Sequence, residues 1–258
     1  MEKNKPSDIY TPRFYSRNFE DKAKSAKIIL GLLYQFYKPQ SVVEFGCARG
    51  AWLAVAESLG AERLKGFDGE WVKQETLFSK NIDFTACNFE EAMPKLNEKF
   101  DLCICLEVAE HISEDKAQLF IQNLCESSNT VLFSAAIKYQ GGANHINEKW
   151  QSYWIDLFAL NDYECFDIFR GVLWNNDSVD FWFKQNMFLF VGPDNSLLNL
   201  NKLRDSQKPV FDIVHPTCYI NKIKSSKKAG KKLTIRNYAG RFKQFIIKHL
   251  IKHSDIDS

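Results

Sequence analysis

The sequence predicts an α/β protein with a doubly wound, mostly parallel sheet of seven strands, followed by a basic helical tail. Short apolar runs of strand length alternate with segments of helical periodicity over residues 41–191, a pattern typical of a parallel sheet covered on both faces. The first apolar run breaks directly into a glycine turn, as first strands of such sheets do. A change of charge near residue 195 separates the tail from this body.

The predicted elements follow from apolar spacing and from the positions of proline and glycine. In chain order they are a helix over 20–38, a strand over 41–45, a helix over 51–58, a strand over 64–67, a helix from Trp71, strands over 82–84 and 100–106, a helix holding Leu119, Phe120 and Leu124, a strand over 130–135, a helix over 150–160, and strands around 164–173 and 181–191. We expect the last strand to be antiparallel and inserted at the sheet edge.

Composition and charge divide the chain into three parts. Residues 1–40 form an N-terminal arm and helix, 41–195 the main domain, and 196–258 a basic, partly flexible extension. The extension holds 14 Lys/Arg and four Asp, whereas the preceding residues hold 20 Lys/Arg and 28 Asp/Glu. An acidic body with a basic tail suggests that the tail has a partner of its own.

Several protein classes are disfavoured by composition. Apolar content of 45% and charged content of 26% are enough for a full core. The sequence contains no run of 18 apolar residues and opens on a polar stretch, so we expect neither a transmembrane helix nor a secretory signal. Seven scattered cysteines predict reduced thiols in a cytoplasmic protein.

The first strand carries a glutamate and two glycines in the pattern Glu44-x-Gly46-x-x-x-Gly50. Gly46 permits a sharp turn, and Gly50 permits close packing of the next helix against a strand and a ligand. The spacing departs from the G-x-G-x-x-G pattern of dinucleotide sites. Glu44 places negative charge at the turn, which favours a cationic ligand over a pyrophosphate.

Two further polar positions follow successive strands, Asp68 after the second and Asn88-Phe89 after the third. Together with the glycine turn they resemble the class I S-adenosylmethionine (SAM)-dependent methyltransferases, which have a Rossmann-like fold. By that resemblance, SAM is the cofactor, and Asp68 accepts hydrogen bonds from its ribose hydroxyls. The resemblance also assigns further cofactor contacts to Glu44, Gly46, Cys47, Gly50, Asn88, Phe89 and Leu106.

A second constellation, Glu107-x-x-Glu110-His111, ends the fourth strand, and His145 follows the fifth. We expect Glu107, Glu110 and His111 to share one helical face. Two carboxylates and two imidazoles suit Mg²⁺ or Mn²⁺. The pattern resembles metal-dependent O-methyltransferases of the ubiquinone pathway and small-RNA 2′-O-methyltransferases, which implies metal activation of the acceptor. The alternatives are a metal-free site with His111 or His145 as base, assisted by Glu107, and a structural role.

The stretch 134–154 resembles the acceptor-side loop of methyltransferases encoded with bacterial surface-polysaccharide genes. Its amides suit hydroxyl groups and its aromatic rings suit sugar faces, although Trp150 and Trp154 could equally be core residues. The aromatic clusters 174–177 and 181–186 could rim the same pocket. The predicted function is O-methylation of a sugar hydroxyl or decorating group in capsule or lipopolysaccharide biosynthesis.

Alternative functions are metal-dependent RNA 2′-O-methylation, methylation of a phosphate-type sugar modification, and SAM binding without catalysis. We expect a small-molecule or glycan acceptor and no nucleic-acid partner, because the body is acidic. The basic tail either contacts anionic lipid at the inner membrane surface, binds a polyanion, or is a solvated extension.

Overall fold

The computed structural model describes residues 19–193 and 212–227. The predicted N-terminal arm and most of the predicted basic extension over 196–258 lie outside these residues. The described chain divides into two compact units, one ending at His215 and one starting at Pro216. This division lies C-terminal to the charge change at residue 195. In the second unit, residues 216–227 form a helix.

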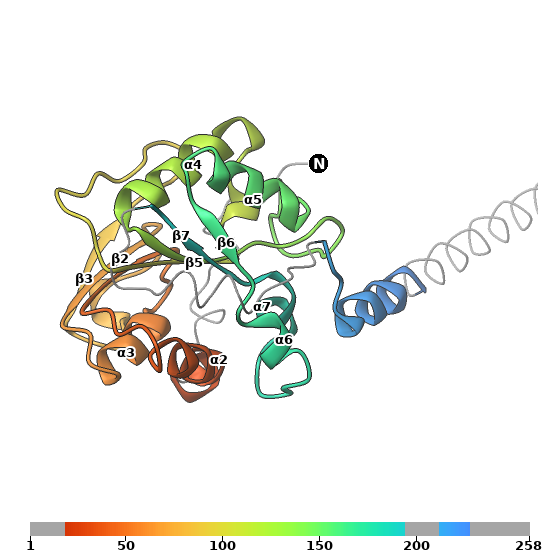
Figure 1. Cartoon of the computed structure of the whole chain (residues 1–258), viewed down its shortest axis with the longest axis horizontal. Coiled ribbons are helices and arrows are strands. Elements are labelled where there is room, and N and C mark those ends of the chain that lie inside the picture. Colours follow the sequence, from red (N-terminus) through yellow and green to blue (C-terminus); the bar gives the residue numbers. More distant parts are fainter. Residues whose placement is uncertain (1–18, 194–211, 228–258) are drawn as a thin grey trace, which may run out of the picture. The chain divides into compact units, whose positions relative to one another are not determined.

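Within the described part of the first unit, seven strands form one sheet in the order β3-β2-β1-β4-β5-β7-β6 (Figure 1). The strands are β1 (Ser41–Phe45), β2 (Arg63–Asp68), β3 (Ile82–Ala86), β4 (Leu102–Leu106), β5 (Thr130–Ser134), β6 (Glu164–Phe166) and β7 (Phe188–Val191). The first five are parallel, and β7 is antiparallel to both β5 and β6. The predicted fold class is confirmed, with the antiparallel strand inserted beside the edge strand β6.

The order of the strands reverses at β1, since β2 and β4 lie on its two sides. At such a switch point the loops after the two central strands diverge and leave room for a ligand. The loops after β1 and β4 therefore bound the natural binding crevice of this sheet.

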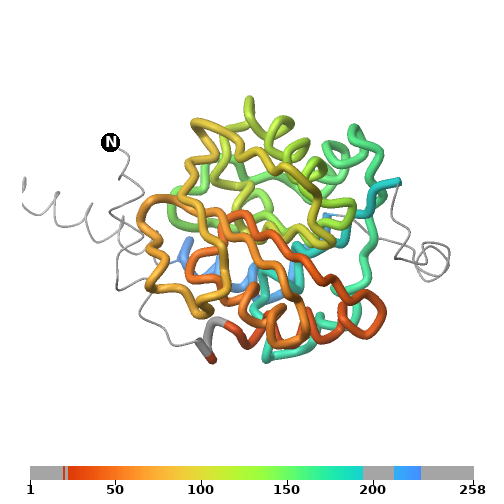
Figure 2. Tube along the Cα trace, turned by 90° about the vertical axis from the view of Figure 1, so that its left-hand side faces the viewer, coloured from red at the N-terminus to blue at the C-terminus, as the bar shows by residue number. Residues whose placement is uncertain are grey.

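Helices cover both faces of the sheet (Figure 1). They are α2 (Phe19–Leu33), α3 (Ala51–Ser58), α4 (Glu114–Ser127), α5 (Gln151–Ala159), α6 (Arg170–Leu173) and α7 (Phe181–Asn186), with single 3₁₀ turns η1 (Gln74–Thr76) and η2 (Ala109–His111). The view in Figure 2 shows the yellow-green segment with α4 above the orange strands.

Two apolar clusters fill the space between the sheet and its helices. In β1 and β4, Val42 and Ile104 face the cluster that contains α2 and α3, whereas Val43 and Cys105 face the cluster that contains α4 and α5. This alternation is the period of a strand buried on both faces. Because α2 contributes fully buried side chains, it belongs to the same core as the sheet.

Three predicted elements differ from the structure. The helix expected from Trp71 is reduced to the turn η1, and the two long C-terminal strands are shortened by α6 and α7. Segment 181–186 is rich in aromatic residues, which favour strands. It is helical because that geometry buries the polar ends of Lys184 and Gln185 against partners, Asn176 O and Gln140 Oε1.

The seven cysteines all lie among the described residues, and none of them forms a disulfide. No helix in the described ranges is long and apolar enough to cross a membrane.

Candidate active site

The turn after β1 is fixed by its backbone. The amides of Gly46 and Cys47 both donate to Phe67 O, over 2.7 and 3.0 Å. Gly46 has φ +77°, and a Cβ at this position would lie 2.3 Å from Val108 Cγ2. A glycine is therefore required here both by the left-handed backbone and by the close approach of the loop after β4.

Gly50 begins α3 with φ +69°. A Cβ on this residue would lie 2.5 Å from Ile82 Cδ1 of β3. Its absent side chain thus permits packing of α3 against the neighbouring strand, which is one of the two roles expected from the sequence. Gly50 does not line the cavity described below.

Glu44 is buried on β1, at 4% exposure. Burial raises the pKa of its carboxyl well above the usual range, and the charge of Asp68 raises it further. Within the described residues its Oε2 has no hydrogen-bond partner. A buried, partly unsatisfied carboxyl is costly unless a donor or a cation meets it, which fits the ammonium and sulfonium groups of SAM.

Asp68 ends β2 and closes the turn. Its two carboxylate oxygens accept hydrogen bonds from the amides of Ala48 and Gly69, each over 2.7 Å. Burial raises the pKa of this carboxyl, while these two amides lower it. Each carboxylate oxygen has capacity for a further donor, so the predicted ribose contact is compatible with this geometry.

The predicted adenine contacts follow β3 but do not line the cavity. The side chain of Asn88 accepts from Glu90 N and donates to Glu91, closing its own turn. Phe89 packs in the core against Phe45 and Phe120, with ring centroids 5.6 Å away in both cases.

A cavity of about 450 Å³ opens at the carboxyl ends of β1 and β4. Of the predicted cofactor residues, it is lined by Glu44, Gly46, Cys47 and Leu106. The predicted catalytic and metal residues Glu107, Glu110, His111 and His145 line the same cavity. The structure thus joins the methionine end of the predicted cofactor site to the predicted reaction site, and leaves Gly50, Asp68, Asn88 and Phe89 outside the lining.

Glu107 leaves β4 in a left-handed conformation, with φ +55°. Non-glycine residues rarely adopt this region, and such strain is concentrated at functional sites. The side chain is held by two amides: Asn186 Nδ2 donates to Oε1 over 3.2 Å and Gln140 Nε2 to Oε2 over 3.1 Å. Burial raises the pKa of Glu107, and these donors oppose that shift.

The expectation that Glu107, Glu110 and His111 share a helical face is wrong. The 3₁₀ turn η2 contains only Glu110 and His111 of the three, because the left-handed Glu107 precedes it. Glu107 is also absent from the group whose ligand atoms converge.

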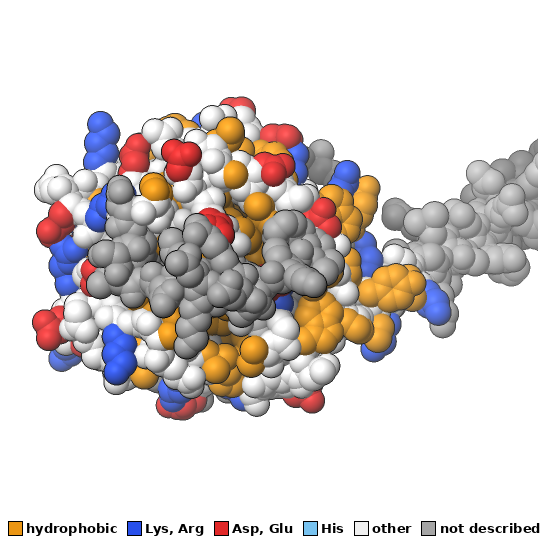
Figure 3. Space-filling model, viewed as in Figure 1, with side chains coloured by type: hydrophobic (Ala, Val, Ile, Leu, Met, Phe, Trp, Pro, Cys, Tyr) orange, Lys and Arg blue, Asp and Glu red, His pale blue; other side chains and the backbone are white. Residues whose placement is uncertain are grey.

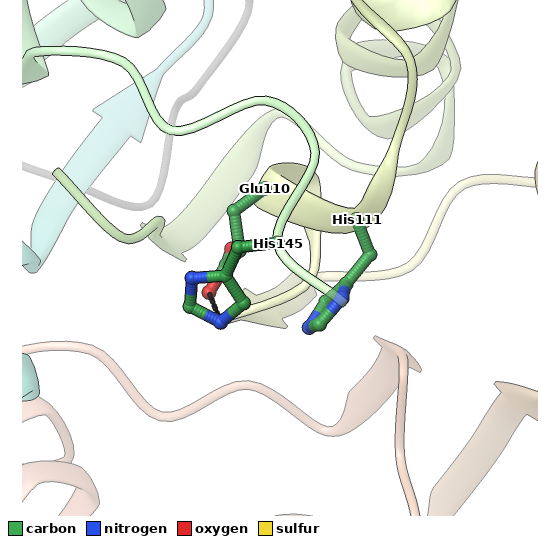
Figure 4. Close-up of side chains that lie close together, drawn as sticks. All are labelled: Glu110, His111 and His145. Atoms are coloured by element: carbon green, nitrogen blue, oxygen red, sulfur yellow. Dashed lines mark ion pairs between the residues drawn. The ribbon is translucent and has the colours of Figure 1, made fainter. Parts of the chain in front are cut away.

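Glu110, His111 and His145 do converge (Figure 4). One potential ligand atom from each lies within 4.8 Å of the other two. His145 Nε2 is 3.9 Å from Glu110 Oε1, and the two imidazole rings meet edge to face with centroids 4.9 Å apart. Two of these side chains come from η2, and the third comes from the loop after β5. In that loop the backbone amides of Ile146 and Asn147 donate to Glu110 O, which holds the loop against η2.

The electrostatic state of this group is unusual. Glu110 is fully buried, and within the described residues neither of its carboxyl oxygens has a hydrogen-bond partner. Burial raises its pKa well above the usual range, and the neighbouring Glu107 raises it further. Burial, together with the smaller effect of the neighbouring His145, lowers the pKa of His111 to about 4. A neutral imidazole with a free ring nitrogen can bind a metal or accept a proton.

Glu148 was not predicted as a site residue. One of its oxygens lies 2.9 Å from His145 Nδ1 and accepts from Gly141 N, and the other accepts from Tyr139 N. This carboxylate fixes the ring of His145 and directs Nε2 toward Glu110. Its i, i+3 spacing from His145 was a usable signal in the sequence.

The acceptor side of the cavity combines predicted and unpredicted residues. Trp182 and Phe183 of α7 and Gln140 line it, as the sequence suggested, together with Asp180, Arg49, Trp52 and Phe78, which were not predicted. Trp154 is a core residue that packs on Phe133, and Trp150 does not line the cavity. Trp174 packs against His215.

Comparisons with known proteins agree with this architecture. Residues 15–176 match the family described as a methyltransferase domain, more than half of the chain. No curated protein matches the sequence.

Solved structures are similar in fold. A chain from the complex of the Haloferax volcanii Trm112 activator with a methyltransferase has a TM-score of 0.54 and 14% identity, over 74% of this chain and all of that one. A Burkholderia thailandensis O-methyltransferase family protein has a TM-score of 0.50 and 9% identity, over 69% of this chain and 59% of that one. A Synechocystis magnesium protoporphyrin IX methyltransferase with bound SAM has a TM-score of 0.49 and 14% identity, over 73% and 86%. The family match shows that this chain belongs to the methyltransferase-domain family and is a SAM-dependent methyltransferase.

Proposed function

We propose that this enzyme transfers the methyl group of SAM to a hydroxyl oxygen of a neutral sugar or similar polyol. The observation that carries the proposal is the convergence of Glu110, His111 and His145 in the cavity that also contains Glu44 and Gly46. Hydroxyls are poor nucleophiles at pH 7, so a methyltransferase that acts on them needs a group that removes the proton or lowers its pKa.

The charge of the cavity favours a neutral acceptor. Its described lining includes the carboxyl groups of Glu44, Glu107, Glu110 and Asp180, against one guanidinium, that of Arg49. Arg49 is engaged, because it donates to Thr76 O and stacks on Phe78 at 4.2 Å. A phosphate or carboxylate on the acceptor would meet four carboxyl groups in this lining, against the single guanidinium of Arg49.

The aromatic rim suits a polyol. Trp182 and Phe183 offer flat faces for sugar C–H groups, and Gln140 offers an amide. Since the stretch 134–154 resembles the acceptor-side loop of surface-polysaccharide methyltransferases, a sugar of a bacterial surface glycan is the acceptor that we favour.

The reaction needs no protein nucleophile. The acceptor oxygen attacks the methyl carbon in line with the breaking sulfur–carbon bond, and the electron pair of that bond stays on sulfur as S-adenosylhomocysteine forms. The hydroxyl proton leaves to a base, and His145 Nε2 is positioned for this role because Glu148 holds Nδ1. The protein contributes alignment of the acceptor with the methyl group.

The three converging side chains also fit a divalent cation. One carboxylate and two imidazoles are common ligands, and the unsatisfied Glu110 would gain the counter-charge that its buried position lacks. When bound there, Mg²⁺ or Mn²⁺ would act as a Lewis acid that lowers the pKa of the acceptor hydroxyl. Glu148 would then be the outer carboxylate that orients a ligating histidine.

RNA 2′-O-methylation uses the same kind of activated hydroxyl and remains the second candidate. On the face seen in Figure 3, basic and acidic side chains are interspersed over the described part, without a basic stripe. Nucleic-acid binding relies on clustered Lys and Arg, so the described part of this face favours the sugar acceptor.

The test is methyl transfer from SAM to a panel of neutral sugars, nucleotide sugars, phosphorylated sugars and RNA, with and without EDTA. The proposal expects transfer to a hydroxyl of a neutral sugar moiety, and transfer confined to RNA or to a phosphate group would contradict it. Loss of transfer in EDTA with recovery on adding Mg²⁺ or Mn²⁺ identifies a metal site. Transfer unaffected by EDTA leaves proton removal to His145.

A further inference from the structure

Glu107 lies at one end of a chain of side-chain amides. Gln140 and Asn186 each donate to one of its oxygens. Gln185 Nε2 donates to both of these amides, over 2.9 Å to Gln140 Oε1 and 2.9 Å to Asn186 Oδ1. We name Gln140, Gln185 and Asn186 the amide relay. Gln185 is fully buried and Asn186 nearly so.

The amide relay is directional. In a side-chain amide the acceptor oxygen and the donor nitrogen point in different directions, so a contact that fixes the oxygen also fixes where the nitrogen points. Because Gln185 donates to the oxygens of Gln140 and Asn186, the nitrogens of those two amides face Glu107. Gln140 Oε1 also accepts from Ile137 N over 3.3 Å and from Asn186 Nδ2 over 3.0 Å, so the direction of Gln140 does not depend on Gln185 alone. If Gln185 were reversed, its oxygen would face Asn186 Oδ1, and Asn186 would have to turn that oxygen toward the carboxylate.

The orientation of the Gln185 side-chain amide is fixed by a backbone N–H outside α7 and outside the sheet. Its Oε1 accepts from His215 N over 2.8 Å. A backbone amide can only donate, so this contact fixes which end of Gln185 points at the amide relay. His215 belongs to segment 212–215, which we name the anchoring segment.

The anchoring segment, which ends the first unit, is held to the rest of that unit by further hydrogen bonds. Asp212 accepts from the backbone and hydroxyl of Ser152, over 2.9 and 2.8 Å. Ile213 O accepts from Gln151 Nε2, and His215 Nε2 lies 3.0 Å from Trp174 O. A segment that begins 60 residues after Ser152 in the sequence therefore contacts Gln185, which is separated from Glu107 by a single side-chain amide.

We propose that Gln185 is a positioning residue for Glu107, and that the backbone of the anchoring segment sets its orientation through His215 N. The proposal rests on the proposed function, because Glu107 lines the cavity in which the reaction is proposed to occur, and it deepens that function. It assigns the start of the C-terminal region a part in building the active site. The left-handed backbone of Glu107 places its side chain in the cavity but does not fix the direction of the carboxylate, which is set by the amides that donate to it.

The first test removes the hydrogen-bonding groups of the Gln185 side chain in one variant and the backbone N–H of His215 in another. Gln185→Met keeps the volume and removes both polar atoms, and we expect kcat for methyl transfer to fall by roughly 10- to 100-fold. His215→Pro removes the backbone N–H and should lower kcat similarly. The matched control His215→Ala keeps that N–H while losing the imidazole, and it should stay within about threefold of the wild type.

A double-mutant cycle with Glu107→Gln separates positioning from general structural support. If Gln185 acts through Glu107, Gln185→Met should cost no more than about twofold in kcat once Glu107 is changed. The same cycle in urea unfolding should show coupling of at least about threefold in the unfolding equilibrium constant. This second measurement applies whether or not Glu107→Gln retains measurable turnover.

The outcomes are distinguishable from those of the proposed function. Additive effects in both cycles, or an equal loss of kcat in His215→Ala and His215→Pro, would overturn the positioning role. A wild type that methylates no hydroxyl acceptor, with coupling still present in the unfolding cycle, would overturn the proposed function and leave the amide relay intact.

Discussion

Replacing Gly46 with alanine tests the structure of the turn that holds the cofactor. Alanine at φ +77° costs about 1–2 kcal/mol relative to glycine. Its Cβ would lie 2.3 Å from Val108 Cγ2, which forces a shift that costs a further ~1–3 kcal/mol. We therefore expect Gly46→Ala to lower the free energy of unfolding by roughly 2–5 kcal/mol, a large part of the ~5–15 kcal/mol of a typical domain.

The assay is urea unfolding of the four proteins of a cycle with Val108→Ala. Removing the methyl groups of Val108 relieves the overlap but not the backbone strain, so the double variant should be more stable than additivity predicts by about 1–3 kcal/mol. Gly31→Ala in α2 is the matched control, because a Cβ there meets nothing within 4 Å. It should be neutral or stabilising by up to ~1 kcal/mol. A Gly46→Ala protein within ~1 kcal/mol of the wild type, or strict additivity, would refute the geometry of the turn.

Three further predictions concern the site. Burial is the main reason that the pKa of His111 is lowered from 6.5 to about 4, so the folded state binds this proton more weakly than the unfolded chain does. In EDTA, the free energy of unfolding should therefore decrease by up to about 3 kcal/mol as the pH falls from about 6.5 toward 4. The variant His111→Gln should show a flatter pH profile. Glu148→Gln should lower kcat by ~10- to 100-fold with little change in SAM affinity by calorimetry, since Glu148 orients His145 without reaching the cavity lining; an unchanged kcat would exclude that role. Asp68→Asn should weaken SAM binding by ~10-fold or more, because it removes charge and an acceptor from the turn at Ala48 and Gly69; unchanged affinity would remove Asp68 from the cofactor site.

The sheet could be predicted because its strands are marked locally. β1, β4 and β5 are short apolar runs bounded by polar residues or glycine, and their limits in the structure lie within two residues of those expected. The segment 181–186 could not be predicted in the same way. Its aromatic residues favour a strand, and it is helical because distant residues supply partners for its buried polar side chains.

The candidate site, like the fold, could be predicted from the sequence only in part. Glu110, His111 and His145 could be assigned to one site because each lies in the connection that follows a parallel strand, β4 or β5, and parallel strands bring their carboxyl ends to one edge. The support of Glu107 could not be predicted, since Asn186 is 79 residues away in the sequence. A pairing over that distance depends on the insertion of β7 beside β5, which determines where α7 ends.

The central claim is that the group formed by Glu110, His111 and His145 activates a sugar hydroxyl for methylation by SAM. The most direct measurement follows transfer of a ¹³C-labelled methyl group by NMR, in the wild type and in His145→Ala, with SAM binding measured in both. We predict an O-methyl signal on a sugar in the wild type and a loss of at least ~100-fold in the variant with SAM affinity retained. An undiminished O-methyl signal in His145→Ala, or a methyl signal on nitrogen or carbon in the wild type, would contradict the claim.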